Sequence, residues 1–175
     1  MKRKNLLPLV LSSFFLALGL VLPFLTAQVK EIGDTLLPMH LPVLLCGALC
    51  GWKYGFTVGI VLPLMRSFLF SMPPLYPNAI WMMAELAAYG LFIGLLYKSG
   101  SRRLGIYPSL LIAMLSGRVV WGVAKSILLG VGSKSFTVAT FIAGGFVDAL
   151  PGIILQLILV PLIVKTAEKI YKKRN

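Results

Sequence analysis

The chain has 175 residues, of which 58% are hydrophobic and 13% are charged, and its formal net charge is +12. A soluble domain carries about 25% charged residues, and an aqueous core of this size cannot bury so much apolar surface. The composition therefore excludes a soluble enzyme and a soluble nucleic-acid-binding domain, despite the basic charge. It indicates an integral membrane protein.

Six apolar segments alternate along the chain with polar or Pro/Gly-rich breaks. A bilayer core about 30 Å thick needs roughly 20 apolar residues per helix, and fewer where protein shelters the segment. Backbone groups in lipid must form their hydrogen bonds within their own segment, which favours helices. We predict an all-α, six-transmembrane-helix bundle that forms one membrane domain over residues 1–175. Its helices are expected at about 6–27, 38–50, 54–70, 79–97, 108–131 and 141–164.

The orientation follows from the distribution of basic residues, because cytoplasmic loops are rich in Lys and Arg. With the N-terminus inside, only Lys30 and Lys134 fall outside the membrane. The inside then collects Lys2, Arg3, Lys4, Lys53, Lys98, Arg102, Arg103, Lys165, Lys169, Lys172, Lys173 and Arg174. We predict a multi-pass protein of the bacterial cell membrane with both termini in the cytoplasm.

The first segment is also compatible with a cleaved signal peptide, because residues 2–4 are basic. Its apolar run is longer than that of a typical signal peptide, and Leu25 to Ala27 is a poor cleavage site. We therefore expect an uncleaved helix.

Cys46 and Cys50 lie one helical turn apart, with no further metal ligands near them in the sequence, so core packing is the expected role of both. The chain has no Walker loop and no dinucleotide fingerprint. We expect no metal, no cofactor and no ATP hydrolysis by the chain itself. Small residues recur four positions apart, for example Gly55/Gly59 and Gly90/Gly94. This spacing is typical of close helix packing, within the bundle or against another subunit.

Five ionisable residues fall inside the predicted segments: Arg66, Glu85, Arg118, Lys125 and Asp148. A charge at the centre of a membrane helix costs about 2.5–3.5 kcal/mol on insertion scales, so each needs a partner or a wet cavity. Two interpretations remain open. The residues pair with one another, as Glu85 with Arg118 and Asp148 with Lys125, or some of them bind a ligand in a pocket open to the outside.

The fifth segment carries the most informative pattern. Arg118, Trp121, Gly122 and Lys125 share one helix face, and together they can hold an anion and stack a flat group. The other candidates are Glu85 and Tyr89 in the fourth segment, Asn78 at its outer start, and His40, although a lone interfacial histidine is more often simply solvated. The outside breaks 28–37 and 72–77 could cap such a site or serve as connectors.

An intramembrane protease would need two aspartates or a Ser–His pair in their motifs. Asp148 has no second intramembrane aspartate, and Ser116-Gly117 lacks the rest of a serine-protease elbow. We therefore expect no enzyme activity.

Several stretches resemble the substrate-binding (S) components of energy-coupling factor (ECF) vitamin transporters. They are LPMHLPVL at 37–44, GWKYG at 51–55, PLMRS at 63–67, MPP at 72–74, ELAAYG at 85–90 and GRVVWG at 117–122. The resemblance covers nearly the whole chain and is also carried by its length and six segments.

The resemblance implies that the chain binds a small water-soluble vitamin or precursor near the outer face, beneath loops that act as a lid. It further implies partnership with a transmembrane T component and two cytoplasmic ATPases, and toppling in the membrane during release. Ser13 and Ala17 stand where such proteins carry an Ala-x-x-x-Ala motif by which the first helix contacts the T component, with serine in place of the first alanine.

Pantothenate is the leading ligand candidate, because its carboxylate suits Arg118 or Lys125. Pyridoxine-, thiamine-precursor-, riboflavin- and queuosine-precursor-type ligands remain alternatives, since a ring could stack on Trp121. The alternative functions are a stand-alone small-molecule facilitator and a membrane scaffold subunit.

Overall fold

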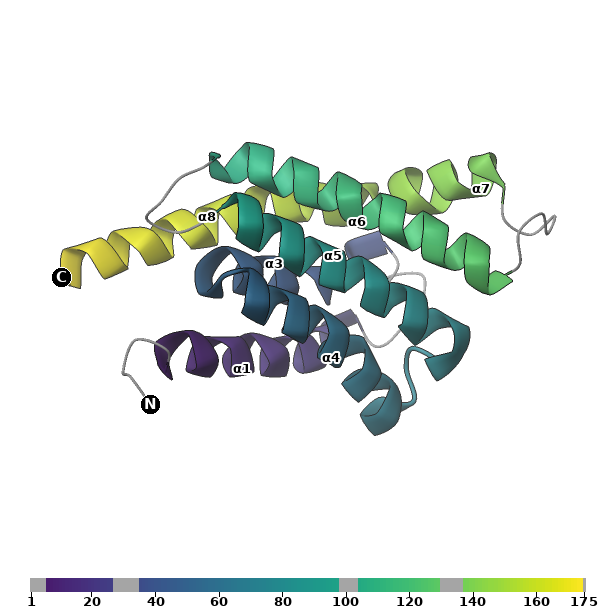
Figure 1. The fold of residues 1–175 in the computed structure, drawn as a ribbon, viewed down its shortest axis with the longest axis horizontal. Coiled ribbons are helices and arrows are strands. Elements are labelled where there is room, and N and C mark those ends of the chain that lie inside the picture. Colours follow the sequence, from purple (N-terminus) through teal and green to yellow (C-terminus); the bar gives the residue numbers. More distant parts are fainter. Residues whose placement is uncertain (1–5, 27–34, 98–103, 130–136, 175) are drawn as a thin grey trace.

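A computed structural model describes residues 6–26, 35–97, 104–129 and 137–174. Helices make up the regular structure of these residues and pack as an elongated bundle (Figure 1). Their bounds are α1 Leu6–Val21, η2 Leu22–Thr26, α3 His40–Cys50, α4 Trp52–Phe70, η3 Leu75–Ala79, α5 Ile80–Leu96, α6 Ile106–Leu129, α7 Val138–Ile142, η4 Ala143–Val147 and α8 Leu150–Arg174.

The long helices run alternately in opposite directions, so that α3 and α8 run the same way (Figure 1). A single residue, Gly51, joins α3 to α4. Helix α1 begins and α8 ends at the same end of the bundle, here called the terminal end, and the other end is the distal end. That both termini lie in the cytoplasm stays a prediction. Among the residues on which the inside assignment depends, Lys2, Arg3, Lys4, Lys30, Lys98, Arg102, Arg103 and Lys134 lie outside the described residues.

The all-α prediction holds for the described residues, and four helical stretches are long and apolar enough to cross a membrane: Leu6–Phe24, Leu75–Leu96, Ile106–Leu129 and Leu150–Ile170. Helix α4 has 19 residues and α3 only 11. The protein is an all-α membrane protein. That it crosses the bilayer six times stays a prediction.

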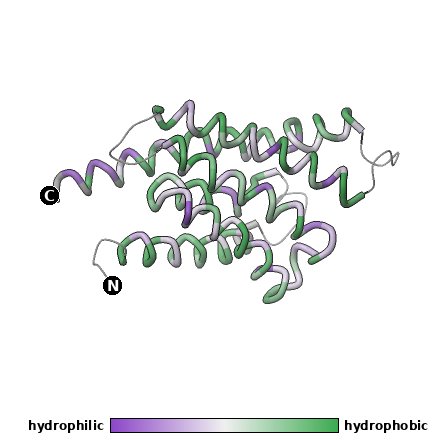
Figure 2. The backbone as a smooth tube through the Cα atoms, in the orientation of Figure 1, coloured by the Kyte–Doolittle hydropathy of each residue, from purple (hydrophilic) through white to green (hydrophobic). Residues whose placement is uncertain are grey.

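The sixth predicted segment, 141–164, differs from the structure. The chain is interrupted after η4, and α8 begins afresh at Leu150 and continues to Arg174. Glycine is a poor helix former, and Gly144 and Gly145 lie in η4, just before the interruption at residues 148–149. Pro151, at the second position of α8, suits a helix start because its missing N–H would be unpaired there anyway. The turns of α8 beyond Val164, where the predicted segment ends, are largely hydrophilic and project from the terminal end (Figure 2).

Glycines bring α3, α4 and α5 into backbone contact. A Cβ added to Gly47 of α3 would lie 2.6 Å from the carbonyl oxygen of Gly90 in α5. A Cβ on Gly55 of α4 would lie 2.6 Å from the Cα atom of Gly47. Contacts this short are possible only without side chains. The small residues in these three helices therefore serve packing within the bundle, as one of the two interpretations predicted.

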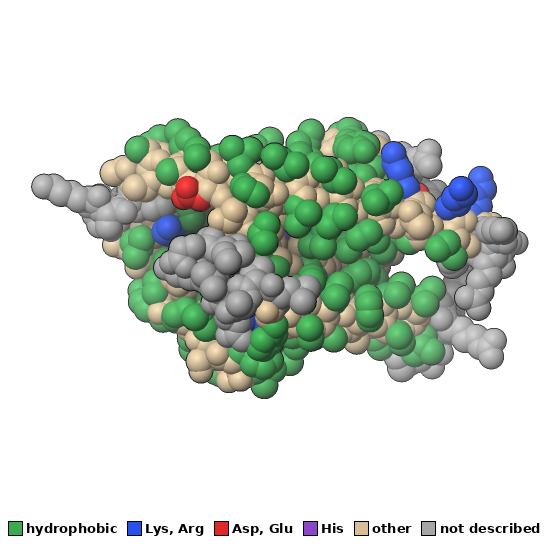
Figure 3. All heavy atoms as spheres, turned by 180° about the vertical axis from the view of Figure 1, so that it is seen from behind, with side chains coloured by type: hydrophobic (Ala, Val, Ile, Leu, Met, Phe, Trp, Pro, Cys, Tyr) green, Lys and Arg blue, Asp and Glu red, His purple; other side chains and the backbone are tan. Residues whose placement is uncertain are grey.

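The surface is apolar over most of its length, as expected for helices that face lipid. Large exposed hydrophobic residues such as Phe14, Phe68 and Ile158 lie on separate helices. In the view of Figure 3 the visible basic side chains gather mainly at one end of the molecule, where the exposed Lys165, Lys169 and Lys172 of α8 lie. Cys46 is buried and Cys50 half-buried in the core, both as free thiols, which agrees with the predicted packing role.

Candidate functional site

Four polar residues meet around one carboxylate oxygen inside the bundle. Oε1 of Glu85 in α5 lies 2.9 Å from Nη1 of Arg118 in α6 and 3.3 Å from Nε2 of His40 in α3. It also accepts a hydrogen bond of 3.2 Å from the hydroxyl of Tyr89. All four side chains belong to residues no more than 4% exposed. His40, Glu85, Tyr89 and Arg118 are called the Glu85 cluster below.

Local structure explains why these residues meet. Tyr89 follows Glu85 by one helical turn, which places both on the same face of α5. Gly117 precedes Arg118 in α6, and a Cβ there would overlap the ring of Tyr89. His40 is the first residue of α3, and its ring packs edge-to-face on Tyr89 with centroids 5.2 Å apart. The start of α3 at His40 and the lack of a side chain at Gly117 thus allow α3, α5 and α6 to contribute to one polar cluster.

The Glu85 cluster has hydrogen-bonding capacity that the described part of the chain does not use. Nε and Nη2 of Arg118 are buried and have no hydrogen-bond partner among the described residues. Neither ring nitrogen of His40 has a hydrogen-bond partner among the described residues, although its Nε2 lies 3.3 Å from Oε1 of Glu85. A buried donor without a partner costs about 1–3 kcal/mol. The charges of the cluster are therefore partly neutralised, but some of its buried donors have no hydrogen-bond partner among the described residues.

An aromatic and cationic patch continues the face of α6 from the Glu85 cluster. Nζ of Lys125 lies 4.6 Å from the ring centroid of Trp121 and 5.2 Å from that of Trp81 in α5. The guanidinium carbon of Arg118 lies 6.0 Å from the Trp121 ring. Phe141 of α7 packs against Trp121 at 5.9 Å between centroids. The predicted stripe on α6 is thus present, with two cations beside one indole.

Arg66 is buried but belongs to a different place. Its Nη1 donates a hydrogen bond of 2.7 Å to the carbonyl oxygen of Leu20, and its Nε donates one of 3.3 Å to that of Met72. The rings of Phe24 and Phe70 each lie 5.4 Å from its guanidinium carbon. The side chain therefore fastens the end of α1 to the end of α4. In this structure it is not part of the Glu85 cluster.

Two other candidates lie at the edge of the structure rather than in the cluster. Asp148 is exposed at the junction between η4 and α8, and Asn78 is half-buried in η3. The break that contains η3 does approach α6, because the hydroxyl of Tyr76 donates a hydrogen bond of 3.3 Å to the carbonyl oxygen of Leu128. Of the other predicted cap, residues 28–34 lie outside the described residues.

Sequence reasoning missed two further buried or aromatic residues. Trp81 lies beside Lys125, and Gln156 of α8 is 1% exposed with neither amide atom hydrogen-bonded to any described residue. A lone amide inside the apolar run 150–164 was the available signal for Gln156. Trp81 could not be assigned from the sequence, because tryptophan is also typical of the membrane interface.

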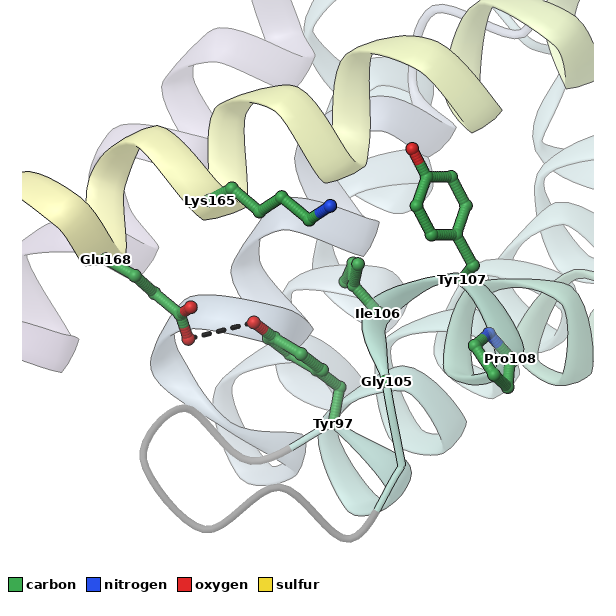
Figure 4. A pocket seen from close by; sticks show the side chains of 7 residues that line it. All are labelled: Tyr97, Gly105, Ile106, Tyr107, Pro108, Lys165 and Glu168. Carbon is green, nitrogen blue, oxygen red and sulfur yellow. Dashed lines mark hydrogen bonds between the residues drawn. The ribbon is translucent and has the colours of Figure 1, made fainter.

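A groove lies at the terminal end, away from the Glu85 cluster. It offers about 230 Å³ and is lined by Tyr97, Gly105, Ile106, Tyr107, Pro108, Lys165 and Glu168 (Figure 4). The hydroxyl of Tyr97 donates a hydrogen bond of 2.8 Å to Glu168, and Nζ of Lys165 lies 5.2 Å from the ring centroid of Tyr107. None of the predicted site residues lines this groove.

A buried cluster of ionisable groups in an apolar helical bundle is typical of membrane proteins that bind or move a polar solute. The chain belongs to the family of ECF transporter substrate-specific components, which matches residues 8–164. It is therefore a membrane subunit for the uptake of vitamin-type substrates. Members of this family are transporter subunits rather than enzymes. Membership implies a small-molecule substrate and partnership with an ECF T component and ATPases. No curated protein and no solved structure matches the chain.

Proposed function

We propose that this subunit binds a small water-soluble vitamin or precursor with an acidic group, with pantothenate as the leading candidate. The ligand lies in the distal half of the bundle, against the Glu85 cluster and the face of α6 that carries Trp121 and Lys125. The protein crosses the membrane six times with both termini in the cytoplasm. It delivers its ligand together with a T component and two ATPases.

The observation that carries this proposal is the state of the Arg118 side chain. Nη1 is engaged by Glu85, while Nε and Nη2 are buried without a partner in the described structure. These two nitrogens form one edge of the planar guanidinium, which matches the two oxygens of a carboxylate. A ligand carboxylate would satisfy both donors at once.

The charges of the region support an anionic ligand. Arg118 and Lys125 contribute two positive charges, and the buried carboxylate of Glu85 contributes one negative charge. Both cations lie beside the Trp121 ring, where an acidic group of a ligand would be attracted to each of them. The indole of Trp121 beside both cations offers a surface for an apolar or flat part of the ligand.

Exposed small residues support docking of a T component on α1. Ser13 and Ala17 lie one turn apart on the outer face of this helix. The Ser13 hydroxyl donates a hydrogen bond of 3.1 Å to the carbonyl oxygen of Leu9, so its polar group is satisfied within the helix. The pair therefore offers a shallow, low-polarity surface on which another helix can pack closely.

Binding measured on the purified chain in detergent tests the ligand assignment. Pantothenate, pyridoxine, a thiamine precursor, riboflavin and a queuosine precursor are titrated in parallel by calorimetry. We expect micromolar or tighter affinity for pantothenate, and a loss of at least roughly 2 kcal/mol, about thirtyfold, in the Arg118→Ala variant. If no vitamin binds, the scaffold function replaces this proposal.

Co-purification tests the transport mechanism separately. A tagged chain is expected to recruit a T component and two ATPases from its native membrane. A chain that never recruits them contradicts the ATP-driven mechanism. Uptake that persists without the ATPases would identify a stand-alone facilitator.

A further inference from the structure

We infer that Gln156 is a ligand-contacting residue, and that the substrate carries, besides its acidic group, a group that both donates and accepts hydrogen bonds. A secondary amide or the lactam edge of a heterocycle has this property. The inference rests on the proposed function and adds a second recognition element to it.

The first observation is the isolation of the Gln156 amide. The residue is 1% exposed on α8, and neither Oε1 nor Nε2 has a hydrogen-bond partner in the described parts of the chain. One turn further along α8, Val160 is completely buried in the apolar core. Burying an amide without a partner in such surroundings is unfavourable, while methionine would fill a similar volume without this cost. A ligand group that both donates and accepts hydrogen bonds would satisfy this amide.

The second observation is the position of Gln156 in the bundle. A Cβ on Gly152 would lie 2.6 Å from the carbonyl oxygen of Thr35 and 2.9 Å from that of Leu36, so α8 contacts the segment just before α3. Helices α3 and α8 pack together and run in the same direction (Figure 1). His40 is four residues beyond Leu36, and Gln156 is four residues beyond Gly152. Gln156 therefore lies one turn beyond this contact, on the face of α8 that Gly152 turns toward the segment before α3.

The chemistry of the region then defines the substrate more narrowly. The Gln156 amide has one acceptor oxygen and an NH₂ donor, which complement the N–H and C=O of an amide in the ligand. In the Glu85 cluster, Nδ1 of His40 is also buried without a hydrogen-bond partner among the described residues. Nε and Nη2 of Arg118 bind the acidic group of the ligand. Pantothenate, with a carboxylate, an amide and hydroxyl groups, satisfies both ends, whereas nicotinate has the carboxylate but no amide.

Ser109 provides a matched control. It is also fully buried with an unpartnered hydroxyl in the described structure, and it lies on α6, as Arg118 does. Nine residues separate the two, which is about 13 Å along the helix axis. A buried polar group at that distance is outside the proposed site.

The test compares pantothenate and nicotinate binding to the wild type and to Gln156→Met, Gln156→Glu and Ser109→Ala in nanodiscs. We expect Gln156→Met to lower the affinity for pantothenate at least tenfold and to reduce the ratio of the pantothenate affinity to the nicotinate affinity. The melting temperature of the ligand-free protein should stay unchanged or rise. Gln156→Glu removes the donor and adds a negative charge, so it should lower affinity as well. Ser109→Ala should bind like the wild type.

Wild-type affinity in both Gln156 variants, with binding lost in Arg118→Ala, would overturn this inference and leave the proposed function standing. If Gln156→Met does not fold, the Gln156→Glu titration decides alone. If the wild type binds neither pantothenate nor any other vitamin of the panel, the proposed function fails, and the role of Gln156 fails with it.

Discussion

Arg118 of α6 and Glu85 of α5 form a buried ion pair with 2.9 Å between Nη1 and Oε1. It is one of the two pairings that the sequence left open. Removing one partner of a buried pair leaves an uncompensated charge, which costs about 3–5 kcal/mol. Arg118 can both pair with Glu85 and bind a ligand, because only one of its nitrogens is engaged by Glu85. Mutations can separate the structural role from the ligand-binding role.

We expect Glu85→Gln and Arg118→Met to lower the free energy of unfolding by about 3–5 kcal/mol each. The double variant Glu85→Gln/Arg118→Met should recover most of this loss, because no unpaired charge remains. Ligand binding should stay lost in the double variant, since the free edge of the guanidinium is gone. Thermal unfolding and calorimetry in the same detergent measure both properties. A double variant that is stable and binds like the wild type would reduce Arg118 to a structural partner of Glu85.

Arg66 is expected not to tolerate lysine. Its guanidinium donates to two carbonyl oxygens, of Leu20 and Met72, from two different nitrogens. The single ammonium of lysine cannot reproduce this geometry, and hydrogen bonds from charged groups contribute about 1.5–3 kcal/mol each. We predict a melting temperature for Arg66→Lys close to that of Arg66→Met, and well below the wild type. An Arg66→Lys protein as stable as the wild type would show that charge alone suffices there.

Gly90→Ala should disrupt the packing of α4 against α5. A Cβ at this position would overlap the backbone of Gly55, which has no side chain to move away. Overpacking costs about 1–3 kcal/mol and more where backbone must shift. The control is Gly105→Ala, whose Cβ would meet Pro108 at 3.6 Å and no other described residue within 4 Å. Equal melting temperatures of the two variants would contradict the close approach of the helices.

Ala17→Trp should interfere with assembly rather than folding. The residue is exposed on α1, so the indole has room in the isolated subunit but blocks close approach of another helix. We expect unchanged vitamin affinity and a strongly reduced yield of T component in co-purification. Leu115→Trp, on an exposed position of α6, is the matched control and should assemble normally. Equal recovery of the T component with both variants would move the docking surface away from Ala17.

The positions of the helices were largely predictable because the apolar runs are long and the breaks contain Gly, Pro and charges. The interruption after Gly144 and Gly145 was overlooked, since the apolar run continues through it. The extension of α8 beyond Val164 was missed for the opposite reason. A polar helix that leaves the bundle has no hydropathy signal.

Site residues were harder to predict than helices, because hydropathy identifies a charge in a membrane segment but not its partner. Arg66, Arg118 and Lys125 look alike in the sequence, yet one binds backbone carbonyls, one pairs with a carboxylate and one lies over indole rings. These differences depend on which helices touch. For α3, α4 and α5, glycine contacts set that arrangement.

The backbone contacts at Gly47, Gly55 and Gly90 also have a mechanical consequence. Helices that meet through main-chain atoms cannot slide or rotate against one another without collision, so α3, α4 and α5 behave as a stiff frame. His40 lies on α3, and Glu85 and Tyr89 lie on α5, so this packing fixes how the three side chains are placed relative to one another. If such a subunit changes its orientation as a rigid body, the arrangement of these three side chains is kept.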